Sequence, residues 1–407
     1  MIEPGSITAR EAIGRGTDPE SGAEIVQLTS APAIHEDIYG ETPYMDASSH
    51  YLMYITGLRP YPQYPAEVWR ADLQTRQVTL VCDGVPGIAG MAVSTDQRHF
   101  YCLREYADGP SPTRALQRYM PGEYEIVRTD IVTLEQVTYR PDSLPEVRSL
   151  GSLAPDGNTY VFATQLERQL FGIVKCDLAG GEWEVIHEGS DICNAHPQVE
   201  PGRGEDICIQ QNRGCEFDAE GRLVKGVGEE GATLYIIDVN GGNRRELPVG
   251  QPHTWRCQGH QCWIGTGGEI LLTVNGGRSG MEGMLKGPSL AEQMKQQGNL
   301  LAVRAGDEQA RAVANDFLYS HPNASRDGRF FVSDTFYDSA IVVGSIKTGR
   351  KRVLCQSRAS FGMPQYTHPH PYFSPDCRWV IYNSDCTGVP HVYAARVPEG
   401  LLEDLDA

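Results

Sequence analysis

The chain repeats one pattern of polar and apolar positions along most of its length. A turn rich in Pro, Asp, Gly or Ser is followed by five or six residues that favour β-strands, and then by a small polar residue. Such turns suit tight connections between antiparallel strands, so each copy predicts a β-hairpin. The seven copies are MDASSHYLMYITG from Met45, MAVSTDQRHFYCLRE from Met91, SLAPDGNTYVFATQ from Ser152, PQVEPGRGEDICIQQ from Pro197, CWIGTGGEILLTVN from Cys262, NASRDGRFFVSDT from Asn323 and PYFSPDCRWVIYNSD from Pro371.

Each copy is followed by a second predicted hairpin, as in VWRADLQTRQVTLVC from Val68. Two hairpins make a four-stranded blade, and seven such units at intervals of roughly 45 to 65 residues predict an all-β, seven-bladed β-propeller. We expect residues 1–407 to form this single domain. The strand-like segment from Ala23 precedes the first copy and is expected to complete the last blade, which closes the ring. Two stacked β-sandwiches are the alternative, and they explain the sevenfold recurrence poorly.

Two insertions interrupt the repeat, at residues 212–231 and 276–297. Both are expected to be loops. The second is expected to contain a short helix from Ser289 to Gln297, with Ser289 as its N-cap and Glu292 three residues later. Long loops on a rigid scaffold commonly shape a binding face.

Composition and charge exclude some classes of binding partner. The formal net charge is −18, and no run of Lys and Arg is present that would neutralise a phosphate backbone, so nucleic acid is not an expected partner. No apolar stretch is long enough to span a membrane, and the N-terminus lacks the features of a secretory signal, which predicts a cytoplasmic protein without a membrane partner. The 11 Cys lack framework spacing and are interpreted as reduced core residues, with Cys102, Cys176 and Cys208 inside strand-like runs.

Histidines mark the candidate site. His368 and His370 lie two apart in a predicted extended segment stiffened by prolines, so both rings can point the same way. A polar turn is the alternative explanation for this pair alone. However, His196, His260 and His321 stand near equivalent positions of other repeats, just before the turn, where the innermost strand of each blade faces the ring centre. With Gln365 as an amide ligand, the set predicts a metal site suited to Mn, Fe or Zn.

Residues 190–396 resemble the oligogalacturonate lyase family of cytoplasmic pectin-degrading enzymes. The resemblance is carried by Gln365-x-x-His368-Pro-His370-Pro-x-Phe-x-Pro-Asp, by Ser384-Asp385-x-x-Gly388-x-Pro390 and by His321-x-x-x-Ser325-x-Asp327-Gly328. It implies a seven-bladed propeller and a divalent metal, Mn²⁺ above all, held by His321, His368, His370 and Gln365. It also implies that His260 is the general base, and His196 is expected to bind substrate.

One position departs from the family. The resemblance places a catalytic-site arginine where this chain has Thr233, which we expect near the substrate. A neutral Thr233 cannot pair with a carboxylate, so Arg213 or Arg256 is a candidate replacement; the alternative is that both are ordinary loop arginines. The departure puts the identity of the substrate in doubt more than the reaction type.

The chemistry of the residues agrees with a lyase acting on an acidic oligosaccharide. Cleavage of a 4-linked uronide removes a weakly acidic C5 proton beside a carboxylate, so a metal that neutralises this carboxylate and a neutral imidazole that takes the proton are both useful. Because the net charge is −18, local positive charge is needed to capture a polyanion. The alternatives are a non-enzymatic interaction module resembling TolB and a propeller glycoside hydrolase.

Overall fold

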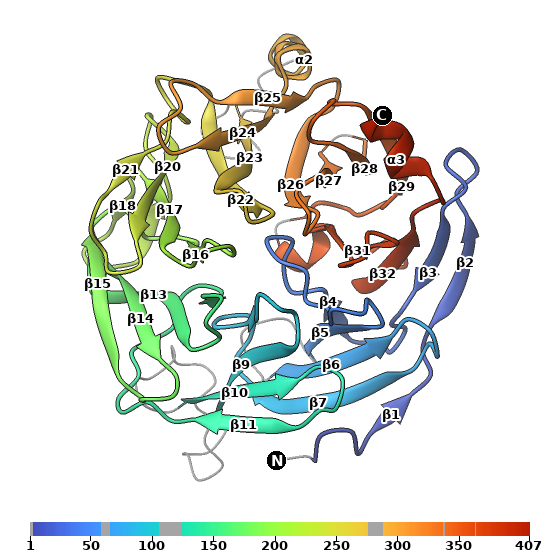
Figure 1. Cartoon of the computed structure of the whole chain (residues 1–407), viewed down its shortest axis with the longest axis horizontal. Coiled ribbons are helices and arrows are strands. Elements are labelled where there is room, and N and C mark those ends of the chain that lie inside the picture. Colours follow the sequence, from blue (N-terminus) through green and yellow to red (C-terminus); the bar gives the residue numbers. More distant parts are fainter. Residues whose placement is uncertain (1–2, 58–65, 106–123, 276–287, 337, 363) are drawn as a thin grey trace.

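The computed structural model describes residues 3–57, 66–105, 124–275, 288–336, 338–362 and 364–407. Its β-sheets follow one another around a ring (Figure 1), which confirms the predicted all-β propeller fold. Five sheets have four or five strands, and a sixth has eight. No helix in these described residues is long and apolar enough to cross a membrane.

The first half of the ring contains three antiparallel sheets, in which successive strands pair except that β1 pairs with β7. The first runs in the order β1-β7-β6-β5-β4, the second β11-β10-β9-β8 and the third β12-β13-β14-β15. Their strands are β1 Thr8–Ala9, β4 Ile34–Glu36, β5 Tyr51–Gly57, β6 Ala66–Asp72, β7 Val78–Val85, β8 Ala92–Val93, β9 His99–Glu105, β10 Tyr124–Asp130, β11 Gln136–Tyr139, β12 Ser152–Leu153, β13 Thr159–Glu167, β14 Leu170–Asp177 and β15 Trp183–Gly189.

The eight-stranded sheet and the four-stranded sheet β26-β27-β28-β29 come next. In the eight-stranded sheet, β20 and β22 are joined by the single residue pair Ala232↔Cys257. Their strands are β16 Gln198–Val199, β17 Asp206–Asn212, β20 Ala232–Asp238, β21 Arg245–Glu246, β22 Arg256–Ile264, β23 Glu269–Asn275, β24 Leu300–Arg304, β25 Arg311–Ala314, β26 Tyr319–Ala324, β27 Phe330–Thr335, β28 Ala340–Ser345 and β29 Lys351–Gln356.

The last sheet closes the ring with strands from both ends of the sequence. Val26 of β3 lies opposite Ala394 of β32, and Leu28 N donates to Val392 O at 2.8 Å. The prediction that an N-terminal strand completes the last sheet is therefore confirmed, and this pairing covers an edge that would otherwise be open. The sheet runs β2-β3-β32-β31-β30, with β2 Ile13–Thr17, β3 Glu24–Gln27, β30 Tyr372–Phe373, β31 Trp379–Ser384 and β32 His391–Arg396.

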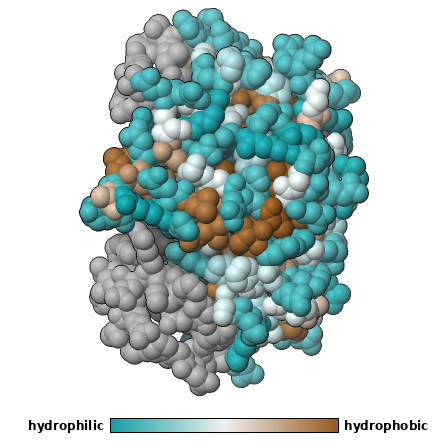
Figure 2. All heavy atoms as spheres, turned by 90° about the vertical axis from the view of Figure 1, so that its left-hand side faces the viewer, coloured by the Kyte–Doolittle hydropathy of each residue, from teal (hydrophilic) through white to brown (hydrophobic). Residues whose placement is uncertain are grey.

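Apolar side chains fill the spaces between neighbouring sheets. Phe330 and Ile341 of one sheet pack with Val380 and Tyr382 of the next in one buried cluster. Burying a large apolar side chain contributes about 1.5–3 kcal/mol, so this packing is a major source of stability. The outer rim seen in Figure 2 is mostly hydrophilic, with a few apolar residues between polar ones.

Both insertions differ in part from expectation. Residues 212–231 contain a small hairpin, β18 Glu216–Phe217 paired with β19 Leu223–Lys225, and are not a plain loop. In the second insertion residues 276–287 lie outside the described residues. Helix α2, Pro288–Gln297, confirms the expected helix, but Ser289 is inside it and is not its N-cap, because Pro288 is the first helical residue. The described residues also contain the 3₁₀ turn η2 Gln365–Thr367 and helix α3 Leu401–Asp406.

The cysteines agree only in part with a core interpretation. All 11 are free thiols, and Cys102, Cys176 and Cys208 are buried in strands as predicted. In contrast, Cys386 is exposed, and three others, Cys193, Cys215 and Cys377, are only partly buried. These four lie at turns or strand ends, where the repeat offers less cover.

Candidate metal centre

Three histidines from two adjacent sheets meet near the ring centre. His321 lies on β26, while His368 and His370 lie between η2 and β30. One ring nitrogen from each comes within 4.8 Å of the other two. We call these three residues, with His196 and His260, the histidine chamber.

Each of the three rings has at least one nitrogen without a hydrogen-bond partner among the described residues. His321 Nδ1 donates to Asp334 Oδ2 at 2.7 Å, and His368 Nε2 donates to Gly362 O at 2.8 Å. His321 Nε2 and His368 Nδ1 are buried without a hydrogen-bond partner among the described residues, as are both nitrogens of His370. Orphaned buried nitrogens are costly, and a carboxylate behind a histidine is the usual support of a metal ligand. The donor set therefore fits a divalent metal.

Burial keeps these imidazoles neutral. His321 is 3% exposed and His370 is fully buried. Burial, with the neighbouring His368, lowers the pKa of His321 well below its ordinary value. Burial and the neighbouring histidines lower the pKa of His370 in the same way. A neutral imidazole is the form that binds a metal, so both rings are ready as ligands near pH 7.

The backbone that presents these rings is irregular. His368 has the extended backbone that the sequence predicts, with a φ of −95° and a ψ of 146°. His370 does not, because its φ is 43°. His196, which also precedes a proline, has the same φ of 43°. Left-handed backbone at a non-glycine residue is strained and recurs at functional sites. The reason given for the convergence of His368 and His370 was therefore wrong at His370, although their ring centres do lie only 5.7 Å apart.

β-Bulges place His260 and His321 side by side. The pairing of β22 with β23 shifts between Cys257 and Gln261, and that of β26 with β27 shifts between Tyr319 and Pro322. Bulges commonly redirect a side chain beside an active site. The two ring centres are 4.1 Å apart. Gly259 makes the first bulge possible, since its φ is 88° and an added Cβ would lie 2.5 Å from Gln210 Oε1.

His260 has the properties of a proton acceptor. Its Nδ1 donates to the carbonyl of Ser320 at 3.2 Å, which leaves the Nε2 lone pair free. Burial lowers the pKa of His260 well below its ordinary value, and the nearby His321, His196 and His368 lower it further. His260 is therefore neutral and able to accept a proton at neutral pH.

His196 carries the opposite charge preference. Its Nδ1 donates to Glu41 Oε1 at 2.5 Å. Burial acts to lower the pKa of His196, but the charge of Glu41 and this hydrogen bond outweigh it, so the pKa is raised. His196 is therefore the member of the chamber that favours a positive charge.

Tyr39 lies among four of the histidines. Its ring centre is 4.5 Å from that of His370, and those of His196, His321 and His260 follow at 5.9, 6.4 and 6.5 Å. Burial raises the pKa of Tyr39 well above its ordinary value, so it is a neutral phenol. Sequence reasoning missed Tyr39, Glu41 and Asp334. None carries a repeat signal, and the first two come from the opposite end of the sequence from His370.

The remaining predicted residues are outside the group formed by His321, His368 and His370. Gln365 begins η2 and is exposed, so its role as a fourth ligand stays a prediction. Thr233 is buried and its hydroxyl donates to Val249 O at 2.6 Å. Arg213 Nη2 and Thr233 Cβ each lie 3.2 Å from the place that a Cβ on Gly250 would occupy, so the Arg213 guanidinium is beside Thr233.

Both candidate arginines hold backbone carbonyls. Arg213 donates to Gly231 O at 3.0 Å, Gln251 O at 2.8 Å and Glu230 O at 2.9 Å. Arg256 donates to Glu229 O. Each arginine therefore anchors the 212–231 insertion. The sequence had suggested either a substrate-binding cation or an ordinary loop arginine, and neither interpretation included this anchoring role.

Comparison with known proteins bears on this arrangement. No protein-family model matches the chain. A 68-residue stretch, 16% of the chain, is 38% identical to the oligogalacturonide lyase of Pectobacterium atrosepticum and spans 18% of that relative's length. The oligogalacturonate lyase structure from Vibrio parahaemolyticus matches with a TM-score of 0.71 and 19% identity, covering 97% of this chain and 99% of the other. The chain resembles the oligogalacturonate lyases.

A second solved structure extends the likeness in fold. It is an oligogalacturonate lyase in complex with manganese, and it matches with a TM-score of 0.70 and 17% identity over 97% of this chain and 98% of the other. At these identities the structural likeness concerns the fold, whereas the sequence match covers a short part of the chain. The resemblance to oligogalacturonate lyases noted from the sequence motifs is thus confirmed by a short sequence match, and the two solved structures show a shared fold.

Proposed function

We propose that this chain is a metal-dependent lyase that cleaves uronic-acid-containing oligosaccharides by β-elimination. The observation that carries the proposal is the group His321, His368 and His370, whose unpartnered nitrogens converge beside the neutral base candidate His260. Mn²⁺ is the metal we expect, because a solved oligogalacturonate lyase of the same fold is in complex with manganese. Gln365 is proposed as a further ligand.

A divalent metal held here would neutralise the uronate carboxylate and stabilise the negative charge that develops beside C5. The chain's own residues then divide the remaining work. His260 Nε2 accepts the C5 proton, since its Nδ1–H is occupied by Ser320 O. His196, held by Glu41, offers positive charge to the anionic substrate.

We infer that Arg213 provides the cation that Thr233 cannot. Its guanidinium is beside Thr233 and is bound by three neutral carbonyls. The nearest carboxylate oxygen described, on Glu230, is 3.9 Å away on a side chain that is 75% exposed. The positive charge of Arg213 is therefore little cancelled and remains available to an anion. Arg256 is the second candidate for the same role.

We also infer that the ring has seven blades. Five sheets have the size of a blade, and the eight-stranded sheet would supply two more, β16-β17-β20-β21 and β22-β23-β24-β25. The single residue pair between β20 and β22 supports this division, because the neighbouring strands inside each of these two units are joined by at least two residue pairs.

The proposal is tested with protein purified without chelators. Elemental analysis is expected to find about one divalent transition metal per chain, and digalacturonate or another 4-linked uronide is expected to yield products with the ultraviolet absorbance of an unsaturated uronate. Chelation should abolish turnover, and Mn²⁺ should restore it. Metal-free protein that cleaves as well as the loaded protein, or a uronide panel that yields no unsaturated product, would contradict the proposal.

The arginine assignment is tested separately with Arg213→Ala and Arg256→Ala, with Arg222→Ala in the same insertion as the matched control. Arg222 is 68% exposed and pairs with Asp218, so its loss should leave turnover unchanged. Loss of Arg213 should raise the KM for uronide by at least about tenfold, since a charge-assisted pair with a carboxylate is lost. Equal KM values in all three variants would show that neither arginine replaces the missing contact.

A further inference from the structure

A polar cavity lies where the innermost strands run into the repeat turns. It has a volume of about 340 Å³ and is lined by the repeat turns, so we call it the turn cavity. Along β26 the chain passes from His321, in the histidine chamber, to Asn323 and Arg326, which line this cavity. At about 3.3 Å per residue, Asn323 lies roughly 7 Å from His321 along the chain, and Arg326, just beyond the end of β26, lies roughly 16 Å from it.

Residues 37–44 lie between the two sites. In Figure 1 this blue segment enters the centre of the ring. Gly40 packs so closely against the chain before β30 that an added Cβ would lie 3.1 Å from the carbonyl carbon of His370. The carbonyl oxygen of Gly40 accepts a hydrogen bond from Asn323 Nδ2 at 3.0 Å. Glu41 lines the turn cavity while its Oε1 binds His196. The segment therefore contacts both sites, and Glu41 itself touches each of them.

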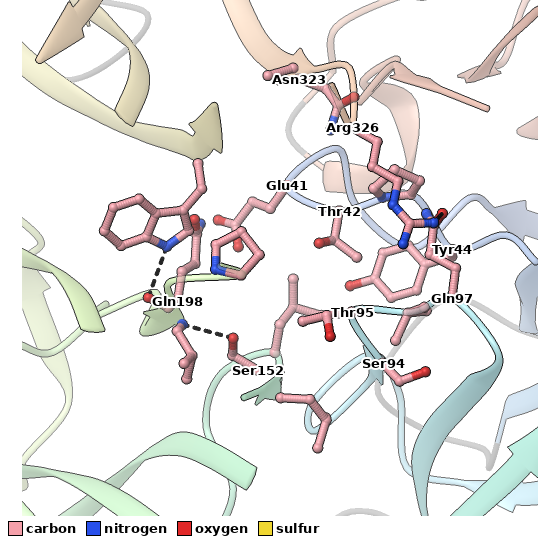
Figure 3. A pocket seen from close by; sticks show the side chains of 18 of the residues that line it. Glu41, Thr42, Tyr44, Ser94, Thr95, Gln97, Ser152, Gln198, Asn323 and Arg326 are labelled. Carbon is pink, nitrogen blue, oxygen red and sulfur yellow. Dashed lines mark hydrogen bonds between the residues drawn. The ribbon is translucent and has the colours of Figure 1, made fainter. Parts of the chain in front are cut away.

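The cavity presents polar groups that the protein leaves unused. Tyr44 and Gln97 are 2% and 6% exposed, yet both line the cavity, and Figure 3 shows them on one side of it with Glu41 across from them. Among the described residues the hydroxyls of Tyr44, Thr42 and Thr95 have no hydrogen-bond partner. The Tyr44 oxygen is not among the buried unpartnered atoms, so it faces the cavity.

Arg326 gives the cavity a positive charge. Its Nη1 donates to Gln97 Oε1 at 3.2 Å, and no ion pair joins it to a carboxylate within the described residues. Asp96 and Glu41 also line the cavity, so the positive charge is single and acidic groups are near. This balance disfavours a dianion such as phosphate and favours a ligand with one negative charge and several hydroxyl groups.

We propose that the turn cavity binds a small sugar acid. The ligand's carboxylate pairs with Arg326, and its hydroxyls bind Tyr44, Thr42, Thr95 and the carboxylate of Glu41. The volume is at the lower end of ligand pockets, which suits one or two sugar rings. This site goes beyond the proposed lyase activity, which uses the histidine chamber; only the choice of a uronate as probe rests on that function.

The test is calorimetric titration of the full chain with D-galacturonate and with D-galactose as the neutral analogue. Chelator-treated wild-type protein should still bind galacturonate, and galactose should bind at least about tenfold more weakly, because it lacks the carboxylate. Arg326→Ala should lose at least about tenfold in affinity for galacturonate in the chelated protein. Arg378→Ala is the matched control, since Arg378 belongs to the corresponding turn of the last repeat, is 78% exposed and does not line the cavity.

Each result decides the matter. Galacturonate binding that disappears on chelation belongs to the histidine chamber and overturns the proposal, as do equal affinities for galactose and galacturonate or an Arg326→Ala variant with wild-type affinity. Absence of binding in the chelated wild-type protein also overturns it. Turnover of uronides by Arg326→Ala is expected to stay within about twofold of wild type, so failure of the second site and failure of the lyase proposal give different results.

Discussion

The histidine chamber and the turn cavity are built along the same inner strands, yet they differ in chemistry. The first presents neutral imidazole nitrogens that hydrogen bonding has left free, while the second presents hydroxyls and one arginine. In the turns Ser and Asp largely satisfy each other: Ser94 Oγ donates to Asp96 Oδ1 at 2.5 Å, and the Ser325–Asp327 and Ser374–Asp376 bonds are 2.6 and 2.7 Å.

The difference shows that some positions of the repeat serve the fold, while others remain available for binding or catalysis. The recurring Ser-x-Asp turn is a device for ending a strand, and its side chains are largely consumed by that task. The histidines lie on the inner strands or just before them, outside the Ser-x-Asp turns, where the repeat imposes no partner. Chemistry in this fold therefore arises where a repeat position is free to vary, and the turn cavity draws its unused groups from outside the Ser-x-Asp pairs.

Removing His370 should separate the two regions most sharply. We expect His370→Ala to lose its metal and at least about 10³-fold in turnover, because metal stabilisation of the developing charge is worth several kcal/mol. Binding of galacturonate in the turn cavity should survive. His253→Ala is the matched control, as His253 is exposed and outside the chamber. Circular dichroism should confirm folding; a folded His370→Ala that keeps metal and turnover would refute the ligand assignment.

His260→Ala tests whether His260 is the general base and not one of the metal ligands. Turnover should fall by about 10²–10⁴-fold, the usual contribution of a general base, while the metal content stays at the wild-type level. Elemental analysis beside initial rates measures both. A variant that loses its metal together with its activity would place His260 among the ligands.

Glu41→Gln acts at the boundary and should affect both regions moderately. Glu41 raises the pKa of His196, so its neutralisation should lower that pKa and remove positive charge from the chamber at pH 7. We expect about a tenfold higher KM for uronide, with a smaller change in kcat. NMR titration of His196 checks the cause: an unchanged pKa in Glu41→Gln would show that the pair does not set the charge.

The smallest expected effect is the change in wild-type turnover with pH. Burial lowers the pKa of His260, so the base stays neutral as the pH falls to its ordinary value of about 6.5 and becomes protonated only below it. The acid limb of kcat/KM should therefore lie below pH 6.5. Rates measured in overlapping buffers test this, and an acid limb above pH 7 would argue against His260 as the base.

Sequence reasoning located the histidines because each stands at a comparable place in a local repeat. The hairpins are local too, and ring closure by the segment from Ala23 follows from a missing strand in the last repeat. Those inferences need only neighbouring residues and the geometry of strands.

What the sequence could not supply depends on contacts over long distances. Tyr39 and Glu41 reach the chamber from a segment between two strands of the first sheet, and Asp334 supports His321 from the adjacent strand. The left-handed backbone of His370 and the bulge at His260 are set by packing in the finished ring. Arg213 and Arg256 were recognised as charges, but their carbonyl partners lie in the irregular insertion.

The closure of the ring has a consequence for how the protein matures. β3 pairs with β32, and soon after β3 the chain places Tyr39 and Gly40 against His370, so segments far apart in the sequence meet at the candidate metal centre. His368 and His370 follow His321 in the sequence, so a chain synthesised only as far as β26 lacks two of the three candidate ligands. A metal that binds only the closed ring stabilises it by mass action. Metal uptake should thus follow the closure of the ring, and bound metal should stabilise the contact between the last sheet and the segment that follows β3.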